Sequence, residues 1–198
     1  MRKGEATKAE ILDATGRLLA QKGVKGTGLA EIVKASRAPK GSLYFHFPGG
    51  KDELTCAALT ESSAKWRARL QSEMQPAESA GHAIVKACEG LARRLSRSGF
   101  SIGCPVATTT LEVAAENDAI RAVCAHHFTS WIEYLRALFV AHGMPASRAA
   151  AFATLTLSSI EGALLLARAE RSTAPLTTCG ALLKELVDDA CASSSTHG

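Results

Sequence analysis

Residues 26–47 read GTGLAEIVKASRAPKGSLYFHF, and this stretch predicts two short helices joined by a tight turn. Thr27 or Gly28 can cap the first helix, because each residue type is favoured where backbone N–H groups are left free. The apolar residues of that helix recur at i, i+3 and i+4, which places them on one buried face. They are Leu29, Ile32 and Val33. Pro39 suits the first position of the second helix, where its missing N–H costs little.

The second helix of this pair, expected from about Pro39 to Phe45, is too short to be stable alone. Leu43 and Phe47 are expected to face inward. The open side then carries small or polar residues, namely Lys40, Gly41, Ser42, Tyr44 and His46. Such a helix can donate to phosphates and approach DNA closely. The stretch therefore predicts a DNA-binding helix-turn-helix.

The charge of the chain is unevenly placed. Residues 1–51 hold ten Lys/Arg and four Asp/Glu, whereas residues 52–198 hold thirteen and fifteen. A basic N-terminal quarter is typical of a nucleic-acid contact, although a solvated basic face is the plainer alternative. Its coincidence with the helix-turn-helix favours DNA. The arm formed by residues 1–6, with Arg2 and Lys3, can reach phosphates or the minor groove or be frayed.

The string T-G-L-A-E-I-V-K-A-S-R-A-P-K-G-S-L-Y-F-H-F, followed by K-D-E-L, resembles the DNA-binding signature of the TetR family of bacterial transcriptional repressors. This chain departs from the usual Gly-Val-Ser-x at residues 36–39, and it has F-P-G-G-K where many members have a shorter link. The resemblance implies that Lys51 contacts phosphate. The DNA-contacting residues expected from the pattern and the resemblance are Arg2, Lys3, Thr27, Gly28, Arg37, Lys40, Gly41, Ser42, Tyr44, His46 and Lys51.

The remainder of the chain shows helical periodicity and no sustained alternation, so it predicts an all-α protein of about nine helices. The further helices are expected at about 7–22, 51–74, 79–98, 105–116, 118–142, 147–171 and 177–192. Residues 1–51 would form a three-helix helix-turn-helix domain, and residues 52–198 an effector-binding and dimerisation domain. The segment SGFSIGCPVATTTLEVAAENDAIR resembles the LmrA/YxaF-like branch of the family, which has a Gly-Cys-Pro step before its sixth helix.

The last two helices are the candidates for a homodimer interface. Residues 147–171 are apolar nearly all round, and a helix of this kind must be buried on all sides. A two-fold dimer would also serve an inverted-repeat operator, whereas burial within one subunit is the alternative. The expected interface residues are Phe152, Leu155, Ile160, Gly162, Leu164, Leu182, Leu183 and Leu186.

A small-molecule site within the central helices is implied by the family resemblance. Aromatic side chains with few polar groups would select a lipophilic or aromatic effector, although aromatics at helical spacing also serve as plain core. The candidate ligand-binding residues are Trp66, Phe100, Cys104, Thr108, His127, Phe128, Trp131 and Tyr134.

Two other chemistries are weaker alternatives. Cys124, His126 and His127 suggest a metal site, but adjacent histidines on a helix point apart. The six cysteines lack C-x-x-C spacing and are expected to be reduced thiols, with a redox switch at Cys104 or another thiol as the alternative. No secretory signal or apolar run of membrane-spanning length is expected. We therefore expect a cytoplasmic repressor that binds double-stranded DNA and an effector, with no enzymatic activity, cofactor, metal or membrane partner.

Overall fold

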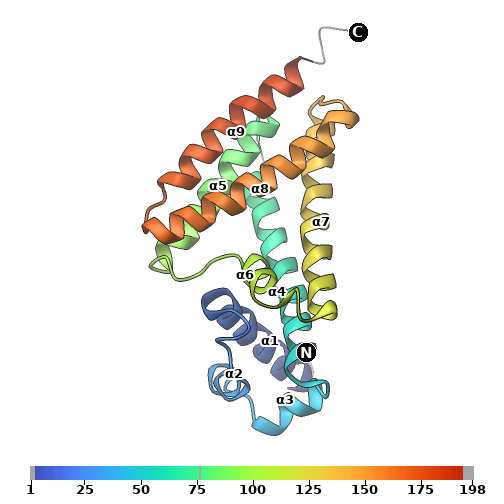
Figure 1. Ribbon diagram of the computed structural model, residues 1–198, viewed down its shortest axis with the longest axis vertical. Coiled ribbons are helices and arrows are strands. Elements are labelled where there is room, and N and C mark those ends of the chain that lie inside the picture. The colour runs from blue at the N-terminus through green and yellow to red at the C-terminus, as the bar shows by residue number, and fades with distance from the viewer. Residues whose placement is uncertain (1–2, 76, 194–198) are drawn as a thin grey trace. The chain divides into compact units, whose positions relative to one another are not determined.

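The computed structural model describes residues 3–75 and 77–193, and within these ranges the chain forms nine α-helices and no strand. This confirms the all-α prediction. Figure 1 labels the helices in chain order. Their bounds are α1 Lys3–Lys22, α2 Leu29–Ser36, α3 Lys40–His46, α4 Gly50–Met74, α5 Ala80–Arg97, α6 Pro105–Val113, α7 Asp118–Ala141, α8 Ala146–Glu170 and α9 Ala174–Ala192.

Two helices begin earlier in the chain than the sequence predicts. Helix α1 starts at Lys3, so much of the expected arm is helical, and Glu5 lies in its first turn, where a negative charge suits the helix dipole. Helix α9 starts at Ala174 and accommodates Pro175 in its first turn. A proline there loses no helical hydrogen bond. Pro175 is therefore part of α9, whereas the sequence predicts that this helix starts at about residue 177.

The chain is divided into two compact units. The first contains the residues up to Trp66 together with Cys104–His127, and the second contains Arg67–Gly103 with the chain from Phe128 onward. In the first unit α1 packs against α2, α3 and α6. The core of that unit includes several fully buried apolar side chains, namely Ile11, Leu19, Ile32, Leu43, Phe47, Leu54 and Leu59. The proposed functional boundary at residue 51 stays a prediction.

In the second unit α5 packs against α9, and α9 packs against α8. Glycine allows the close approach of α5 to α9. A Cβ at Gly81 would lie 2.6 Å from the Lys184 carbonyl oxygen, and one at Gly180 would lie 3.0 Å from the Cβ of Cys88. Because a backbone carbonyl cannot move aside easily, Gly81 is the more demanding of the two positions.

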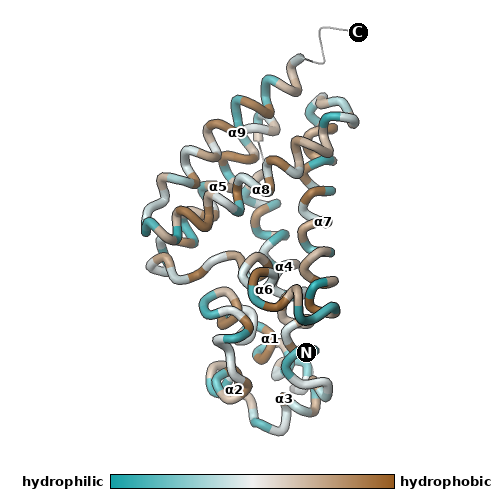
Figure 2. Tube along the Cα trace, viewed as in Figure 1, coloured by the Kyte–Doolittle hydropathy of each residue, from teal (hydrophilic) through white to brown (hydrophobic). Residues whose placement is uncertain are grey.

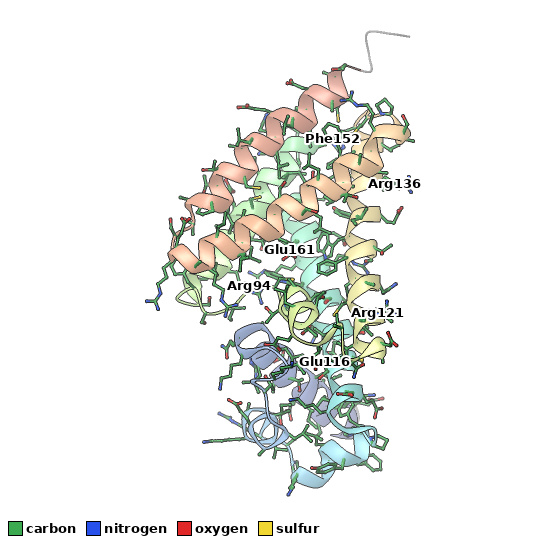
Figure 3. The ribbon with its side chains drawn as sticks, in the orientation of Figure 1. Arg94, Glu116, Arg121, Arg136, Phe152 and Glu161 are labelled. Carbon is green, nitrogen blue, oxygen red and sulfur yellow. The ribbon has the colours of Figure 1, made fainter. Side chains whose placement is uncertain are left out.

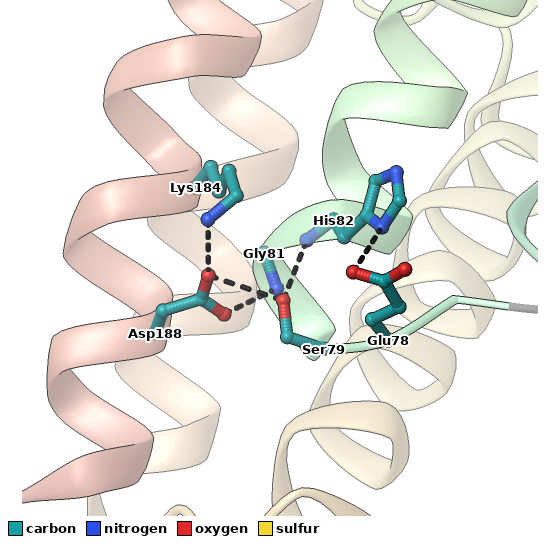
Figure 4. Close-up of polar contacts among 6 residues, drawn as sticks. All are labelled: Glu78, Ser79, Gly81, His82, Lys184 and Asp188. Carbon is teal, nitrogen blue, oxygen red and sulfur yellow. Dashed lines mark hydrogen bonds and ion pairs between the residues drawn. The ribbon is translucent and has the colours of Figure 1, made fainter.

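A polar network joins the start of α5 to α9 (Figure 4). The Asp188 carboxylate accepts hydrogen bonds from the Gly81 N–H at 2.9 Å, the Ser79 hydroxyl at 3.1 Å and the Lys184 ammonium at 2.9 Å. Ser79 in turn caps α5 by accepting from the His82 N–H. Burial acts to raise the pKa of Asp188, but the hydrogen bonds from Lys184, Gly81 and Ser79 outweigh it and hold this pKa below its ordinary value.

We expect Asp188→Asn to make the protein less stable at neutral pH, by about 1–3 kcal/mol. A lowered carboxyl pKa stabilises the fold above the unfolded-state pKa, about 4, and this stabilisation is lost as the pH falls through the lowered value. The free energy of unfolding of the unchanged protein, measured by urea titration, should therefore fall in acid more steeply than that of the variant. The control is the exposed neighbour Asp189→Asn. Equal effects of the two variants would contradict the network.

Helix α8 is long and apolar enough to cross a membrane by length and composition, although one third of its most apolar window is buried within the protein. The sequence was expected to contain no apolar run of membrane-spanning length. That expectation overlooked the many alanines of α8, which raise its mean hydropathy without forming a continuous run of large apolar residues. Figure 2 shows hydrophobic and hydrophilic residues interspersed along α8 and α9. Several large apolar side chains of these two helices remain exposed, namely Leu155, Leu165, Leu166, Leu182 and Leu186.

Candidate nucleic-acid interface

The turn between α2 and α3 is built from residues 36–39, where the sequence departs from the family pattern. Arg37 ends α2 in the left-handed conformation, with φ at 58°. The buried Ser36 hydroxyl accepts from the Ala38 N–H at 3.3 Å and donates to the Val33 carbonyl at 3.2 Å. These bonds close the turn around an exposed arginine in a conformation that favours glycine.

Helix α3 turns one face into the core and the other into solvent. Leu43 and the following Phe47 are buried, which confirms that they face inward. On the outer side Lys40, Gly41 and Tyr44 are exposed, and Ser42 and His46 are half-buried. Lys51 is half-buried in the first turn of α4. Arg37 and Gly28, which flank α2 at its two ends, are exposed, and Gly28 is the N-cap of that helix. Most of the residues expected to contact DNA therefore offer exposed atoms.

Thr27 does not fit the predicted contact set. Its side chain is 1% exposed, and its hydroxyl donates to the Gly23 carbonyl at 2.6 Å. A phosphate cannot reach a hydroxyl that is buried and already bonded, so Thr27 fixes the entry to α2 instead. Arg2 lies outside the described residues, and the structure describes no side chain for Lys3.

Phe45 is an exposed residue of α3 that sequence reasoning missed. Its side chain is 80% exposed, and its ring centroid lies 5.1 Å from that of His46. Helical geometry could have predicted this exposure. Phe45 is two positions from both Leu43 and Phe47, which face inward, so it lies on the opposite side of the helix. The outer face of α3 thus combines a cation, a phenol and an exposed phenyl ring.

Helix α6 is tied to the turn that follows α1. The Glu112 carboxylate accepts from the N–H groups of Val24 at 2.5 Å and Lys25 at 3.1 Å. Gly23, with φ at 70°, makes room for it, because a Cβ there would lie 1.9 Å from a Glu112 oxygen. Glu112 therefore holds the segment between α1 and α2 through two charge-assisted hydrogen bonds.

We expect Glu112→Ala to loosen this turn at a cost of about 1.5–3 kcal/mol, the range for hydrogen bonds to a charged group. Hydrogen exchange at the Val24 and Lys25 amides should become faster. The matched control is Glu116→Ala, which removes the exposed ion pair with Lys25 and should cost about 0–1 kcal/mol. Unchanged protection of the two amides in Glu112→Ala would refute the role of Glu112.

The candidate effector residues are all half-buried and are distributed over both units. Trp66, Cys104, Thr108 and His127 belong to the first unit, and Phe100, Phe128, Trp131 and Tyr134 to the second. In the second unit the Trp131 and Tyr134 rings meet edge to face at 5.8 Å, and burial raises the pKa of Tyr134. Whether the eight residues form one binding site stays a prediction.

Five of the six cysteines have a raised pKa. Burial raises the pKa of Cys88 to about 12 and also raises the pKa values of Cys56, Cys124, Cys179 and Cys191. A higher pKa leaves less thiolate at neutral pH. The Cys104 sulfur accepts from the Ala107 N–H and caps α6. Across the described ranges, no three His, Cys, Asp or Glu side chains gather as a potential metal site.

Comparison with known proteins identifies the helix-turn-helix and the helices that follow it. Residues 11–58 match the model of the TetR family of bacterial regulatory proteins, and residues 80–182 match the C-terminal domain of LmrA/YxaF-like transcriptional regulators. The chain belongs to the TetR family. It is therefore a DNA-binding transcription regulator with a helix-turn-helix, and the families that it matches are families of transcription regulators.

Relatives of this TetR-family regulator match it along most of its length. It is 30% identical to the HTH-type transcriptional regulator LmrA of Bacillus subtilis, over 91% of this chain and 96% of that protein. It is 32% identical to the uncharacterized regulator YxaF of the same organism, over 86% and 89%. A TetR regulator from Rhodobacter sphaeroides is 26% identical with a TM-score of 0.79, covering 89% of this chain and 96% of the other.

Proposed function

We propose that this TetR-family regulator is a cytoplasmic homodimeric repressor. Its two α3 helices would read an inverted-repeat operator, with Lys40, Ser42, Tyr44 and His46 contacting DNA and Lys51 holding phosphate. The observation that carries this proposal is the outer face of α3, which is exposed and offers cationic, hydroxyl, phenol and imidazole groups. Phosphate contacts would set the position of the protein, and side chains of α3 would contact base edges.

The exposed apolar face of α8 and α9 supports dimerisation. A groove of about 670 Å³ between these helices is lined mostly by apolar residues, including Leu155, Leu166, Leu182 and Leu186. Gly162 also lines this groove, and a Cβ added there would meet no other described atom within 4 Å. A second copy that brings the same face would cover both grooves around a two-fold axis.

Four residues of the predicted interface have other contacts within the protomer. Ile160, Leu164 and Leu183 are already buried, and Phe152 is half-buried with the Arg148 guanidinium 5.3 Å from its ring centroid. These residues would pack behind the exposed leucines and would not contact the second protomer directly. The proposed contact surface is therefore narrower than the sequence predicts, and it centres on the exposed leucines.

Buried hydroxyl groups in the first unit support an effector site. Ser63 on α4 and Thr109 on α6 are buried, and their hydroxyls have no hydrogen-bond partner among the residues that the structure describes. Because a buried polar group without a partner is costly, such groups suit a bound molecule that can satisfy them. We propose that a small lipophilic or aromatic effector does so and favours a dimer whose α3 spacing no longer fits the operator.

The test is a fluorescence anisotropy titration with the DNA upstream of the protein's own gene. We expect tight binding by two protomers per site, with an affinity that falls steeply as salt increases. A library of lipophilic and aromatic compounds should contain a molecule that releases the DNA. Equal affinity for the upstream DNA and for shuffled DNA of the same composition would reject the proposed operator.

A further inference from the structure

A small hollow in the second unit is lined by four arginines, and neither the DNA-reading helix nor the candidate effector residues contribute to it. Its volume is about 240 Å³, and α4, α5 and the start of the α5–α6 connection form its walls. The arginines are Arg69, Arg93, Arg94 and Arg97. Arg94 on α5 is labelled in Figure 3. Glu73 is the sole carboxylate that lines the hollow among the described residues.

The carboxylate of Glu73 positions two of these guanidinium groups. One of its oxygens accepts from Arg69 Nε at 3.1 Å, and the other accepts from an Arg93 terminal nitrogen at 3.2 Å. Gly90 makes this possible, because a Cβ there would lie 1.9 Å from a Glu73 oxygen. Arg93 also forms an exposed ion pair with Glu89, at 3.7 Å. A guanidinium has five N–H donors, so each arginine keeps donors beyond those that face these carboxylates. The two groups are thus held in place and can still bind an anion.

The charges around the hollow are unbalanced. Four arginines line it against one carboxylate, that of Glu73. Arg93 and Arg97 are four residues apart on α5, a spacing at which like charges repel and destabilise a helix. Arginine stays charged at all physiological pH values, so a change of protonation cannot relieve this repulsion. Glu73 and Glu89 offset part of the charge of Arg93, and a bound anion can relieve the repulsion further.

From this arrangement we infer that the hollow binds a compact polyanion, one that carries at least two phosphate or carboxylate groups. Guanidinium groups match both oxyanions through paired hydrogen bonds. The hollow is smaller than a typical site for a drug-sized ligand, about 300–1,000 Å³, and its charged walls do not suit the lipophilic effector proposed above. A duplex is too broad to enter a hollow of this size, which separates this site from the operator surface.

Isothermal titration calorimetry with inorganic pyrophosphate and with citrate, at an ionic strength fixed with sodium chloride, tests the site and distinguishes the two anion types. We expect at least one probe to bind the full-length protein, and Arg93→Gln/Arg97→Gln to weaken that binding roughly tenfold or more. Glu73→Gln, which removes the competing carboxylate, should strengthen it several-fold. A purely structural role for these residues would not move the two affinities in opposite directions.

The matched control is Arg121→Gln/Arg136→Gln, which removes the same charge from two arginines of α7 (Figure 3) that form ion pairs at i,i+3 spacing. This control should bind the anion as the unchanged protein does. Equal weakening by both double variants, or no binding of either probe at millimolar concentration, would overturn the site. Loss of binding in Lys40→Gln/Lys51→Gln would place the anion on the DNA-reading surface and would also overturn it. Operator binding is measured separately, so its failure leaves this test intact.

Discussion

The double variant Tyr44→Ala/Lys51→Ala is expected to lose operator binding by roughly 100-fold or more at about 150 mM salt, because each lost contact costs about 1–3 kcal/mol. Tyr44 is 49% exposed on α3, and Lys51 lies in the first turn of α4. The Tyr44 phenol is expected to contact base edges or phosphate. The Lys51 ammonium is expected to contact phosphate only. The titration proposed above for the upstream DNA measures the loss.

The single variants separate the two roles. Lys51→Ala should weaken binding about equally on all sequences and reduce the slope of affinity against salt by about one. Tyr44→Ala should also relax the preference for the operator over shuffled DNA if the phenol reads bases. Arg121→Ala removes an exposed arginine from α7 and serves as the control. Full operator affinity in the double variant, with an unchanged circular dichroism spectrum, would reject this assignment of the site.

Helical periodicity predicted the order and the approximate limits of the nine helices, because most of them bury a recurrent apolar stripe. The starts of α1 and α9 were harder to predict. A helix can begin within a charged segment when packing supports it, and a proline is compatible with both the end of one helix and the start of the next. Such boundaries depend on tertiary contacts that a local pattern does not contain.

The candidate site was predicted less completely than the fold. Thr27 was assigned to DNA from the sequence pattern and the family resemblance, but its side chain is buried and donates to the Gly23 carbonyl. This burial depends on tertiary packing. On α6, Thr108 stays a predicted effector residue, and its hydroxyl donates to the Cys104 carbonyl. The neighbouring Thr109, which the sequence did not single out, is the buried residue. One residue along a helix changes the direction of a side chain by about 100°. Residue chemistry was thus easier to predict than residue orientation.

The prediction that α8 is buried on all sides is not met within one protomer. Leu155, Leu165 and Leu166 of α8 are 49%, 62% and 54% exposed. On α9, Leu182 and Leu186 are 56% and 51% exposed. Exposed apolar surface of this extent is typical of an interface. Burial of α8 on all sides therefore stays a prediction for the proposed dimer, in which a second protomer would cover these leucines.

Leu182→Glu is expected to convert the proposed dimer to a monomer and thereby abolish tight operator binding. In an isologous interface one substitution places two carboxylates, one from each protomer, in an apolar contact. Each buried charge without a partner costs several kcal/mol, and a monomer binds one half-site only. Sedimentation velocity should show a single species near 20.8 kDa, the mass of one chain, at concentrations where the unchanged protein sediments as a dimer.

Leu111→Glu is the matched control for Leu182→Glu, because Leu111 is a leucine of α6 with 84% exposure that lies outside the α8–α9 groove. It introduces the same charge and should leave the dimer intact. Both leucines are largely exposed in the protomer, so neither variant should alter the helical circular dichroism spectrum, and a loss of dimer then reports the interface and not unfolding. A Leu182→Glu protein that remains dimeric would place the interface elsewhere, and the exposed leucines of α8 and α9 would need a different partner.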